Sequence, residues 1–338
     1  MKILVTGGLG FIGSHTVVEL QQKGFDVLIV DDCSNSNEKV LEGIKAITGK
    51  KPALEKFDLK DKDKVESFFK KNTDIAGVIH FAASKAVGES VENPLLYYEN
   101  NVGTLIYILK ELCKKNNASF IFSSSCTVYG QADKMPITEN APVKVAESPY
   151  GNTKQIGEEI IADTCNVTPT LNAIVLRYFN PMGAHPSAEI GELPVGVPQN
   201  LVPFITQTGI GMRKELSVFG DDYQTIDGTC VRDYIYVVDL AKAHVVALER
   251  LLENKNTKNY EVFNVGTGTG SSVLEAIQSF ERISGNKLNY KVVARRIGDI
   301  TSAYADTTKA NTTLGWKSEY SLDDAMKSAW VWEQKIRE

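Results

Sequence analysis

Residues 1–180 alternate short apolar runs, rich in β-branched side chains, with longer stretches of helical pattern. The short runs predict buried strands and the longer stretches predict helices. The predicted strands are Lys2–Thr6, Asp26–Asp31, Gly77–Phe81, Ser119–Ser124 and Thr170–Arg177, and the predicted helices are Phe11–Lys23, Lys39–Thr48, Asp61–Lys71, Pro94–Lys115 and Tyr150–Asn166. This alternation predicts an α/β fold with a doubly wound parallel sheet of the Rossmann type.

The pattern changes after Asn180. Residues 181–233 are rich in proline and glycine, which predicts only short regular pieces there. A helix at Val238–Leu252 and a strand at Tyr260–Val265 are expected to return to the sheet, and the rest of the chain looks mixed. We therefore expect a nucleotide-binding domain at 1–180, with returning elements near 233–266, and a smaller mixed α/β domain at 181–338 that covers a substrate cleft.

Composition narrows the class of protein. Apolar residues make up 43% of the 338 residues, as in a folded globular chain, and the net charge is -5. No arginine precedes Arg177, so a nucleic-acid partner is not expected. The apolar run Ile3–Val5 ends at Thr6, too early for a signal peptide or a membrane span. We expect neither a membrane partner nor an exported protein, which leaves a cytoplasmic one.

Cysteine and histidine spacing gives no sign of a metal site. The five cysteines are scattered and include no Cys-x-x-Cys pair, which argues against both a disulfide framework and zinc. The four histidines share no ligand spacing either. The expectation is that the protein holds no metal.

A glycine-rich segment follows the first predicted strand and opens the first predicted helix. Gly7, Gly10 and Gly13 form a Gly-x-x-Gly-x-x-Gly pattern, which lets backbone N–H groups approach a pyrophosphate at a helix N-terminus. Asp31 closes the second strand, where a carboxylate accepts hydrogen bonds from ribose hydroxyls and repels a 2′-phosphate. The combination favours NAD over NADP and over a glycine turn without a ligand. A later cluster, 266–270, lacks the matching acid and is interpreted as a tight turn.

A tyrosine and a lysine lie one helical turn apart at the start of a predicted helix. Tyr150 and Lys154 follow Ser148-Pro149, downstream of the strand that ends near Ser125. One turn places both side chains on the same face. One interpretation assigns these residues no catalytic role: a surface tyrosine, a solvated lysine and a buried serine-rich strand end. The other interpretation is a catalytic site formed by Ser125, Tyr150 and Lys154, in which Ser125 hydrogen-bonds to a sugar hydroxyl.

Such a tyrosine needs help to act as a base at neutral pH. Its pKa must fall from about 10 to near 7, which corresponds to roughly 4 kcal/mol. A nearby ammonium and a positive nicotinamide ring would supply that stabilisation.

These motifs resemble those of the extended short-chain dehydrogenases/reductases. The general motifs are Thr6–Gly13, Ser123–Gly130 and Tyr150–Lys154; the more specific ones are Phe81–Ser90, Arg177–Pro181, Val231–Tyr234 and Arg295–Asp299, which resemble the UDP-glucose 4-epimerases. The resemblance runs nearly end to end, with similar spacing.

The resemblance implies two sets of site residues beside the catalytic Tyr150, Lys154 and Ser125. NAD would be bound by Gly7, Gly10, Phe11, Ile12, Gly13, Asp31, Asn35, Asp58, Leu59, Phe81, Lys85, Asn100, Tyr150, Lys154 and Phe179. The UDP-hexose would be bound by Lys85, Ser125, Tyr150, Asn180, Asn200, Leu201, Ser217, Phe219, Arg232, Arg296, Asp299 and Ala303. Guanidinium groups suit a diphosphate, although without the resemblance Arg232 and Arg296 could equally be surface ion-pair residues.

One departure from related enzymes favours epimerisation. Sugar-nucleotide dehydratases and decarboxylases of this superfamily carry an acidic residue just after the Ser/Thr of this strand, where this chain has Cys126, Thr127 and Val128. The implied reaction interconverts UDP-galactose and UDP-glucose through a 4-keto sugar. The alternatives are another UDP-sugar epimerase, such as a uronate 4-epimerase, and a nonenzymatic NAD-sensing regulator; such regulators lack an intact serine, tyrosine and lysine set.

Ala303 bears on substrate breadth. In the family pattern this position lies beside the hexose; relatives with tyrosine there favour glucose and galactose, and relatives with a small residue also accept 2-acetamido sugars. Ala303 therefore predicts additional activity on UDP-N-acetylglucosamine and UDP-N-acetylgalactosamine. The alternative is that Tyr304 swings in to fill the space.

The helix predicted at Pro94–Lys115 suggests a homodimer. It carries a broad apolar stripe, Leu95, Tyr98, Val102, Leu105, Ile106, Leu109 and Leu112, with further apolar residues elsewhere, Leu96, Tyr97, Ile108 and Cys113. That is more than one core-facing side requires. Relatives pair this helix and the Tyr150 helix across a two-fold axis. The alternative is a helix buried on both sides within one chain.

Overall fold

A seven-stranded parallel sheet forms the larger part of the molecule in the computed structural model, which describes residues 1–296 and 298–338. The strand order is β11-β6-β5-β4-β1-β2-β3. The strands are β1 (Lys2–Thr6), β2 (Asp26–Asp31), β3 (Ala53–Lys56), β4 (Ile75–His80), β5 (Ala118–Ser125), β6 (Leu171–Tyr178) and β11 (Tyr260–Val265). The predicted α/β class is confirmed, as is the return of the strand Tyr260–Val265 to the sheet, beside β6.

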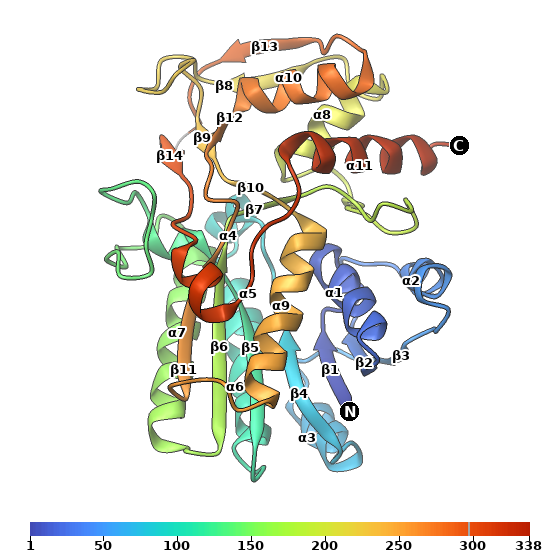
Figure 1. Ribbon diagram of the computed structural model, residues 1–338, viewed down its shortest axis with the longest axis vertical. Helices are drawn as coiled ribbons and strands as arrows, with labels where there is room; N and C mark the ends of the chain where they lie inside the picture. The colour runs from blue at the N-terminus through green and yellow to red at the C-terminus, as the bar shows by residue number, and fades with distance from the viewer. Residues whose placement is uncertain (297) are drawn as a thin grey trace.

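Helices cover both faces of this sheet (Figure 1). One face is covered by α1 (Phe11–Gln22), α2 (Val40–Thr48) and α9 (Val237–Leu252), and the other by α3 (Lys62–Lys71), α6 (Thr104–Leu112) and α7 (Pro149–Val167). Val17 and Leu248 belong to the apolar core on the first face, and Phe68 and Ile161 to the core on the second. Burial on both sides explains why β1, β2 and β4 are almost continuously apolar.

The single helix predicted at Pro94–Lys115 is wrong in detail. The segment consists of α5 (Pro94–Tyr97), a π-helical stretch η1 (Tyr98–Gly103) and α6, and it is preceded by α4 (Val87–Glu92), which was not predicted. A π-helical turn holds more residues than an α-helical one, so it rotates the faces of the helix that follows. Tyr97 and Ile108, expected away from the core, are fully buried, whereas Leu95 of the expected stripe is 80% exposed.

The C-terminal elements form a second group above the carboxyl ends of the sheet (Figure 1). They are β7 (Asn180–Met182), α8 (Leu201–Gly209), β8 (Leu216–Phe219), β9 (Val231–Arg232), β10 (Tyr234–Tyr236), β12 (Ser271–Ser272), α10 (Val273–Ser284), β13 (Tyr290–Val293), β14 (Ser302–Ala303), the short helix η3 (Ala310–Leu314) and α11 (Leu322–Lys335). Another short helix, η2 (Cys126–Tyr129), directly follows β5 of the sheet. They have a core of their own, in which the rings of Phe280 and Trp330 lie 5.2 Å apart.

The two groups meet at the carboxyl ends of the strands. A small apolar cluster there combines Val128, Tyr129 and Phe179 from the sheet side with Ala303 from β14. Open α/β sheets bind ligands at this edge. The fold therefore directs attention to the loops that follow β1, β2, β4, β5 and β6.

No helix within the described residues is both long and apolar enough to cross a membrane.

Candidate active site

The turn after β1 has no room for a side chain at Gly7 or Gly13. Gly7 has a φ of +67°, and a Cβ added to it would lie 2.8 Å from the backbone nitrogen of Ala82. A Cβ on Gly13 would collide with the carbonyl oxygen of Gly7. Gly10 caps α1, and no side chain hydrogen-bonds to the first N–H groups of this helix. The turn thus presents an uncapped helix N-terminus, which suits a pyrophosphate.

Asp31 lies beside this turn, as predicted. One carboxylate oxygen accepts a hydrogen bond from the Leu9 N–H at 3.0 Å. The other accepts from the Cys33 N–H at 2.9 Å and from the Ser36 hydroxyl at 2.8 Å. These bonds fix the carboxylate at the end of β2, 8% exposed, where a ribose diol can reach its remaining lone pairs.

The other expected cofactor residues follow the carboxyl ends of neighbouring strands. Asn35 comes after β2, Asp58 and Leu59 after β3, and Phe81 and Lys85 after β4. Phe11 and Ile12 open α1, and Asn100 lies in η1. The Asn100 side chain donates to the Ser84 hydroxyl at 2.9 Å, so η1 contacts the loop after β4.

Sequence reasoning missed Asn101, the neighbour of Asn100. Its side-chain oxygen accepts from the Ser84 N–H at 2.8 Å, and its amide donates to the Ser84 carbonyl at 2.9 Å and to the Thr153 hydroxyl at 3.0 Å. Asn101 thereby ties the loop after β4 to α7. Nothing in the sequence distinguishes the roles of these two adjacent asparagines, because the π-helical stretch decides which one faces inward.

The catalytic candidates meet at the end of β5. The Ser148 hydroxyl caps α7 by accepting from the Gly151 N–H at 3.1 Å, so Tyr150 and Lys154 fall in the first two turns. Lys154 Nζ donates to the Ser123 carbonyl at 2.8 Å and lies 5.8 Å from the centre of the Tyr150 ring. The expected shared helix face beside the serine-ended strand is confirmed.

Electrostatics of this pair are dominated by burial. Burial raises the pKa of the Tyr150 hydroxyl, Tyr178 adds to the rise, and hydrogen bonding with Ser125 acts in the opposite direction. Burial lowers the pKa of Lys154 to about 8, against an opposing effect of Glu158. Lys154 therefore remains mostly charged at neutral pH. Burial therefore dominates the pKa of Tyr150 in the protein alone; the expected stabilisation of its phenolate by the Lys154 ammonium together with a nicotinamide ring stays a prediction.

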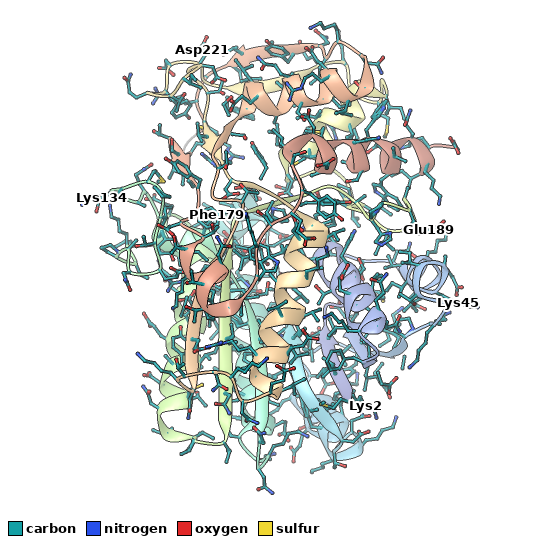
Figure 2. The ribbon with its side chains drawn as sticks, viewed as in Figure 1. Lys2, Lys45, Lys134, Phe179, Glu189 and Asp221 are labelled. Carbon is teal, nitrogen blue, oxygen red and sulfur yellow. The ribbon has the colours of Figure 1, made fainter. Side chains whose placement is uncertain are left out.

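Two further aromatic residues, Tyr178 and Phe179, lie near the catalytic candidates. The Tyr178 and Ser123 hydroxyls share a hydrogen bond of 2.5 Å. Phe179, which follows β6 and is 3% exposed, lies between the sheet and the C-terminal elements (Figure 2). Phe179 was expected near a nicotinamide, and its position at the junction suits that role.

The expected diphosphate residues come together around one carboxylate. Asp299 Oδ1 accepts from Arg232 at 3.3 Å and from Arg296 at 2.8 Å. The Arg296 guanidinium carbon lies 5.8 Å from the centre of the Phe219 ring. Phe219 and Ser217 belong to β8. Two guanidinium groups held side by side suit a diphosphate.

Glu192 contacts both Lys85, which is expected to bind NAD, and Asn200, which is expected to bind the UDP-hexose. Nothing in the sequence indicated this residue. Its Oε1 accepts from the side-chain amide of Asn200, the N-cap residue of α8, at 2.6 Å, and it lies 3.8 Å from Lys85 Nζ. Burial raises the pKa of Glu192, whereas Lys85 and Asn200 act to lower it. Leu201 follows in α8, and Asn180 opens β7, where its N–H donates to the Asp233 carbonyl at 2.9 Å.

The second glycine cluster is a structural turn, as interpreted from the sequence. The fully buried Asp233 carboxylate accepts from the Thr267 N–H at 2.8 Å, from the Thr267 hydroxyl at 2.7 Å and from the Gly268 N–H at 3.1 Å. The same carboxylate accepts from the Ala305 N–H at 3.1 Å. An acidic residue thus occupies the position that an anion would need.

Ala303 lies in β14 and pairs with Arg232 of β9. It is 2% exposed and belongs to the same apolar cluster as Phe179. The Tyr304 ring lies next to Gly270, where an added Cβ would be 2.9 Å from its Cδ1.

Within 1–296 and 298–338, no three histidine, cysteine or acidic residues are grouped as a metal would require.

A Rossmann sheet with a Tyr-x-x-x-Lys pair beside its serine-ended strand, and a C-terminal part that gathers arginines above it, defines the extended short-chain dehydrogenase/reductase class. Residues 4–329 match a family model described as GDP-mannose 4,6 dehydratase. The UDP-glucose 4-epimerase of Bacillus subtilis is 47% identical over 333 residues, which cover 98% of this chain and 97% of that protein.

Two solved structures agree with this relationship. A UDP-glucose-4-epimerase from Stenotrophomonas maltophila with bound NAD and formylated UDP-arabinopyranose is 44% identical, with a TM-score of 0.95 over 100% of this chain and 99% of that one. A UDP-glucose 4-epimerase from Bifidobacterium longum in complex with NAD+ and UDP is 45% identical, with the same TM-score and coverage. The chain belongs to the UDP-glucose 4-epimerase family.

Proposed function

We propose that the protein interconverts UDP-galactose and UDP-glucose through a 4-keto sugar, with NAD bound at the glycine-rich turn. The observation that carries this proposal is the meeting of Ser125, Tyr150 and Lys154 at the carboxyl end of β5, between that turn and the Asp299 arginines. One side of this arrangement suits a dinucleotide and the other suits a diphosphate. The reacting sugar would lie between them.

The cofactor fits the residues present. The uncapped N-terminus of α1 suits its pyrophosphate, and Asp31 suits the adenosine ribose and disfavours a 2′-phosphate. Phe81, Lys85 and Phe179 would border the rest of the dinucleotide. When bound, NAD supplies a hydride acceptor and donor at C4 of the sugar, together with a positive ring charge beside Tyr150.

Tyr150 removes the proton of the 4-hydroxyl group in this proposal, and Ser125 assists through a hydrogen bond to the same hydroxyl. Because burial raises the pKa of Tyr150, its phenolate needs two positive neighbours, the Lys154 ammonium and the cofactor ring. Lys154 is suited to this task because the Ser123 carbonyl fixes its ammonium. The phenol returns its proton to the sugar oxygen when the keto group is reduced on its other face.

The UDP part is held by the C-terminal elements in this proposal. Arg232 and Arg296 would leave their shared contact with Asp299 in part to bind the diphosphate, and the residue pair Ser217 and Phe219 would border the uridine. The absence of a carboxylate at Cys126, Thr127 and Val128 disfavours water loss from the 4-keto sugar. Epimerisation is thus favoured over the dehydration that the family model's description names.

We also propose a division of labour along the chain. Residues 1–180, with the returning elements near 233–266, would bind NAD, and residues 181–338 would bind the UDP-sugar. The separate core of α8, α10 and α11 supports this division. We also propose a cytoplasmic location. The five cysteines, all among the described residues, are free thiols, as is usual for cytoplasmic proteins.

Incubation of the purified protein with UDP-galactose, followed by chromatographic resolution of the products, tests the function. UDP-glucose should form until the two sugars reach equilibrium. Conversion of a UDP-uronate but not of UDP-galactose would favour a uronate epimerase. Turnover of neither sugar, with NAD still bound, would favour a regulator.

Substrate breadth should depend on Ala303. The N-acetyl group adds several heavy atoms at C2, and overpacking a rigid site costs about 1–3 kcal/mol. We therefore expect the wild type to convert UDP-N-acetylgalactosamine, and Ala303→Tyr to lower the ratio of its kcat/KM to that of UDP-galactose about 5- to 150-fold. Comparing both substrates within each variant corrects for any loss of folded protein. Rejection of the acetamido sugar by the wild type would contradict the proposal, as would an unchanged ratio in the variant.

We also propose that the protein is a homodimer. The outer side of η1 and α6 leaves Tyr98, Val102 and Ile106 partly exposed, and Ile156 and Ile160 do the same on α7. The Asn152 side chain of α7 donates to the Tyr98 hydroxyl at 2.7 Å, so the two helical surfaces are joined in one chain. Pairing of two copies through this surface would bury these apolar residues. Light scattering at micromolar concentration should give twice the monomer mass of 37.2 kDa, and a monomer mass would refute the proposal.

A further inference from the structure

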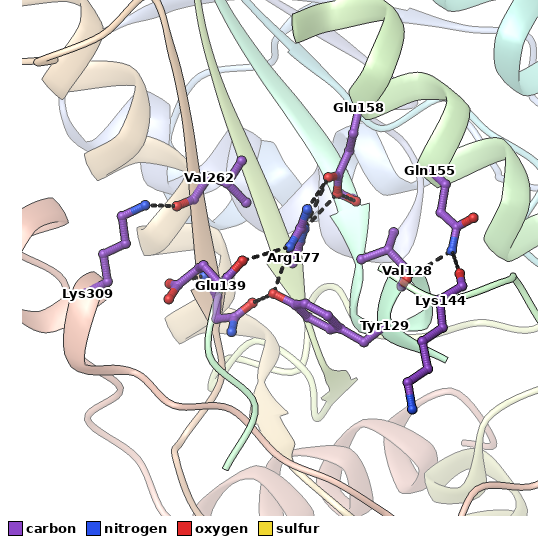
Figure 3. Close-up of polar contacts among 11 residues, drawn as sticks. Val128, Tyr129, Glu139, Lys144, Gln155, Glu158, Arg177, Val262 and Lys309 are labelled. Carbon is purple, nitrogen blue, oxygen red and sulfur yellow. Dashed lines mark hydrogen bonds and ion pairs between the residues drawn. The ribbon is translucent and has the colours of Figure 1, made fainter. Parts of the chain in front are cut away.

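A buried ion pair connects the catalytic helix to the sheet (Figure 3). Glu158 of α7 accepts from Arg177 of β6 through Nη2 at 2.5 Å and through Nε at 3.0 and 3.1 Å. The two side chains are 7% and 8% exposed. Burial opposes the Arg177 charge, but Glu158 outweighs it and raises the Arg177 pKa. Neither residue is among those expected to bind NAD or the UDP-hexose, so catalysis as proposed above leaves this pair unused.

The pair is part of a second attachment between α7 and β5. Ser124 of β5 is the register partner of Arg177 of β6, so both side chains lie on the α7 face of the sheet. The Ser124 hydroxyl donates to Glu158 Oε1 at 2.5 Å. One turn earlier on the same helix, Lys154 donates to the Ser123 carbonyl. Lys154 and Glu158 thus attach successive turns of α7 to successive residues of β5, directly before Ser125.

The far side of Arg177 is also fixed. Its Nη1 donates to the Tyr129 hydroxyl at 2.9 Å (Figure 3). That hydroxyl donates to the Asn264 side-chain oxygen of β11 at 2.7 Å. Tyr129 belongs to η2, which follows Ser125. The network therefore holds both sides of Ser125, the strand before it and the helical turn after it.

We propose that Glu158, held by Arg177 and Ser124, is a positioning residue that aligns Ser125 with Tyr150 and keeps Lys154 protonated. This inference rests on the proposed function. Its electrostatic part follows from helix geometry, since residues four apart on one face are neighbours and a carboxylate there stabilises the ammonium.

Glu158 is the one anionic group near Lys154 among the described residues. The groups around Lys154 are Tyr150 on α7, His80 on β4, Phe122 and Ser123 on β5, and Glu158. Burial, with a smaller effect of Lys154, lowers the pKa of His80 to about 3, so His80 is neutral in the working range. Glu158 acts to raise the pKa of Lys154 against burial. Loss of this carboxylate should let Lys154 lose its proton at lower pH.

Glu158→Gln tests the electrostatic role. We expect the alkaline limb of its kcat–pH profile with UDP-galactose to move about one pH unit lower than in the wild type. Since Glu158→Gln leaves the buried Arg177 charge without its partner, the double variant Glu158→Gln with Arg177→Gln is measured beside it. Loss of the Arg177 cation favours the Lys154 ammonium, so we expect a smaller shift in the same direction. Glu158→Asp keeps the charge and should retain the wild-type limb.

The chain offers a matched control in another buried pair. Arg250 Nε and Nη2 donate to Glu261 at 2.7 and 3.1 Å, with the side chains 10% and 5% exposed, but Glu261 lies near the start of β11, at the end of the sheet away from the site. Glu261→Gln should lower the unfolding temperature without moving the pH profile. An equal shift in this control, or no shift in either Glu158 variant, would overturn the electrostatic role.

Ser124→Ala tests the alignment separately, because it removes one hydroxyl and keeps both charges. We expect kcat to fall about tenfold, with KM and the pH limbs unchanged, since Ser125 loses part of its support. Wild-type kcat in this variant would overturn the positioning role. Absence of epimerase activity in the wild type would instead refute the proposed function, so the two failures are distinguishable.

Discussion

Tyr150→Phe should lower kcat with UDP-galactose by about 100- to 10,000-fold, the range that general acid–base catalysis contributes. The substitution removes one oxygen and leaves the buried ring, so folding and the binding of NAD and UDP should be nearly unchanged. Steady-state kinetics, thermal unfolding and binding titrations with UDP measure these quantities separately.

The control for Tyr150→Phe is Tyr236→Phe. Tyr236 is also buried, and its hydroxyl donates to the Ala184 carbonyl at 2.7 Å within the C-terminal elements. Loss of this hydroxyl should affect stability more than turnover. Near-normal activity of Tyr150→Phe would refute Tyr150 as the base, as would an equal loss of turnover in the Tyr236 variant.

Lys154→Ala should have the second largest effect, a loss of about 100-fold or more in kcat. Removal of the ammonium leaves the Tyr150 phenolate with one positive neighbour fewer, which raises the Tyr150 pKa. Because the active form carries deprotonated Tyr150, the acid limb of the profile and the pH optimum should move to higher pH. A kcat–pH profile with UDP-galactose measures this shift.

Lys309→Ala is the matched control for Lys154→Ala. Lys309 Nζ donates to the Val262 carbonyl at 2.7 Å (Figure 3). It also lies 4.9 Å from the centre of the Phe263 ring. Lys154 has the same pair of contacts, with the Ser123 carbonyl and the Phe122 ring at 2.8 and 5.0 Å. Lys309→Ala should leave the pH optimum in place. An unmoved optimum in Lys154→Ala would show that the electrostatic role is wrong.

Features that depend on short stretches of chain could be predicted from the sequence. The bounds of β1 and β2 agree with the prediction, because a buried parallel strand is a continuous apolar run. The glycine turn and the Tyr150–Lys154 helix were also found, since spacing along one turn fixes their relative positions. The π-helical stretch at Tyr98–Gly103 was not found, because its hydrogen bonds leave no periodic signal of their own.

Contacts between distant segments could not be predicted. Glu192 bridges Lys85 and Asn200, and Glu158 meets Arg177 and Ser124, only after the sheet and the C-terminal elements have come together. The direction of the Tyr150 pKa is a similar case. The sequence shows the lysine one turn away but not the burial that raises the Tyr150 pKa. The roles of the individual site residues remain predictions that the variants above address.

UDP-galactose deuterated at C4, incubated with the purified protein in ordinary water, tests the central claim most directly. Mass spectrometry of the separated products gives both the extent of epimerisation and the fate of the label. The proposed function predicts that UDP-glucose forms to equilibrium and keeps the deuterium at C4, because the hydrogen leaves and returns without entering solvent. No UDP-glucose, or UDP-glucose that carries solvent hydrogen at C4, would contradict it.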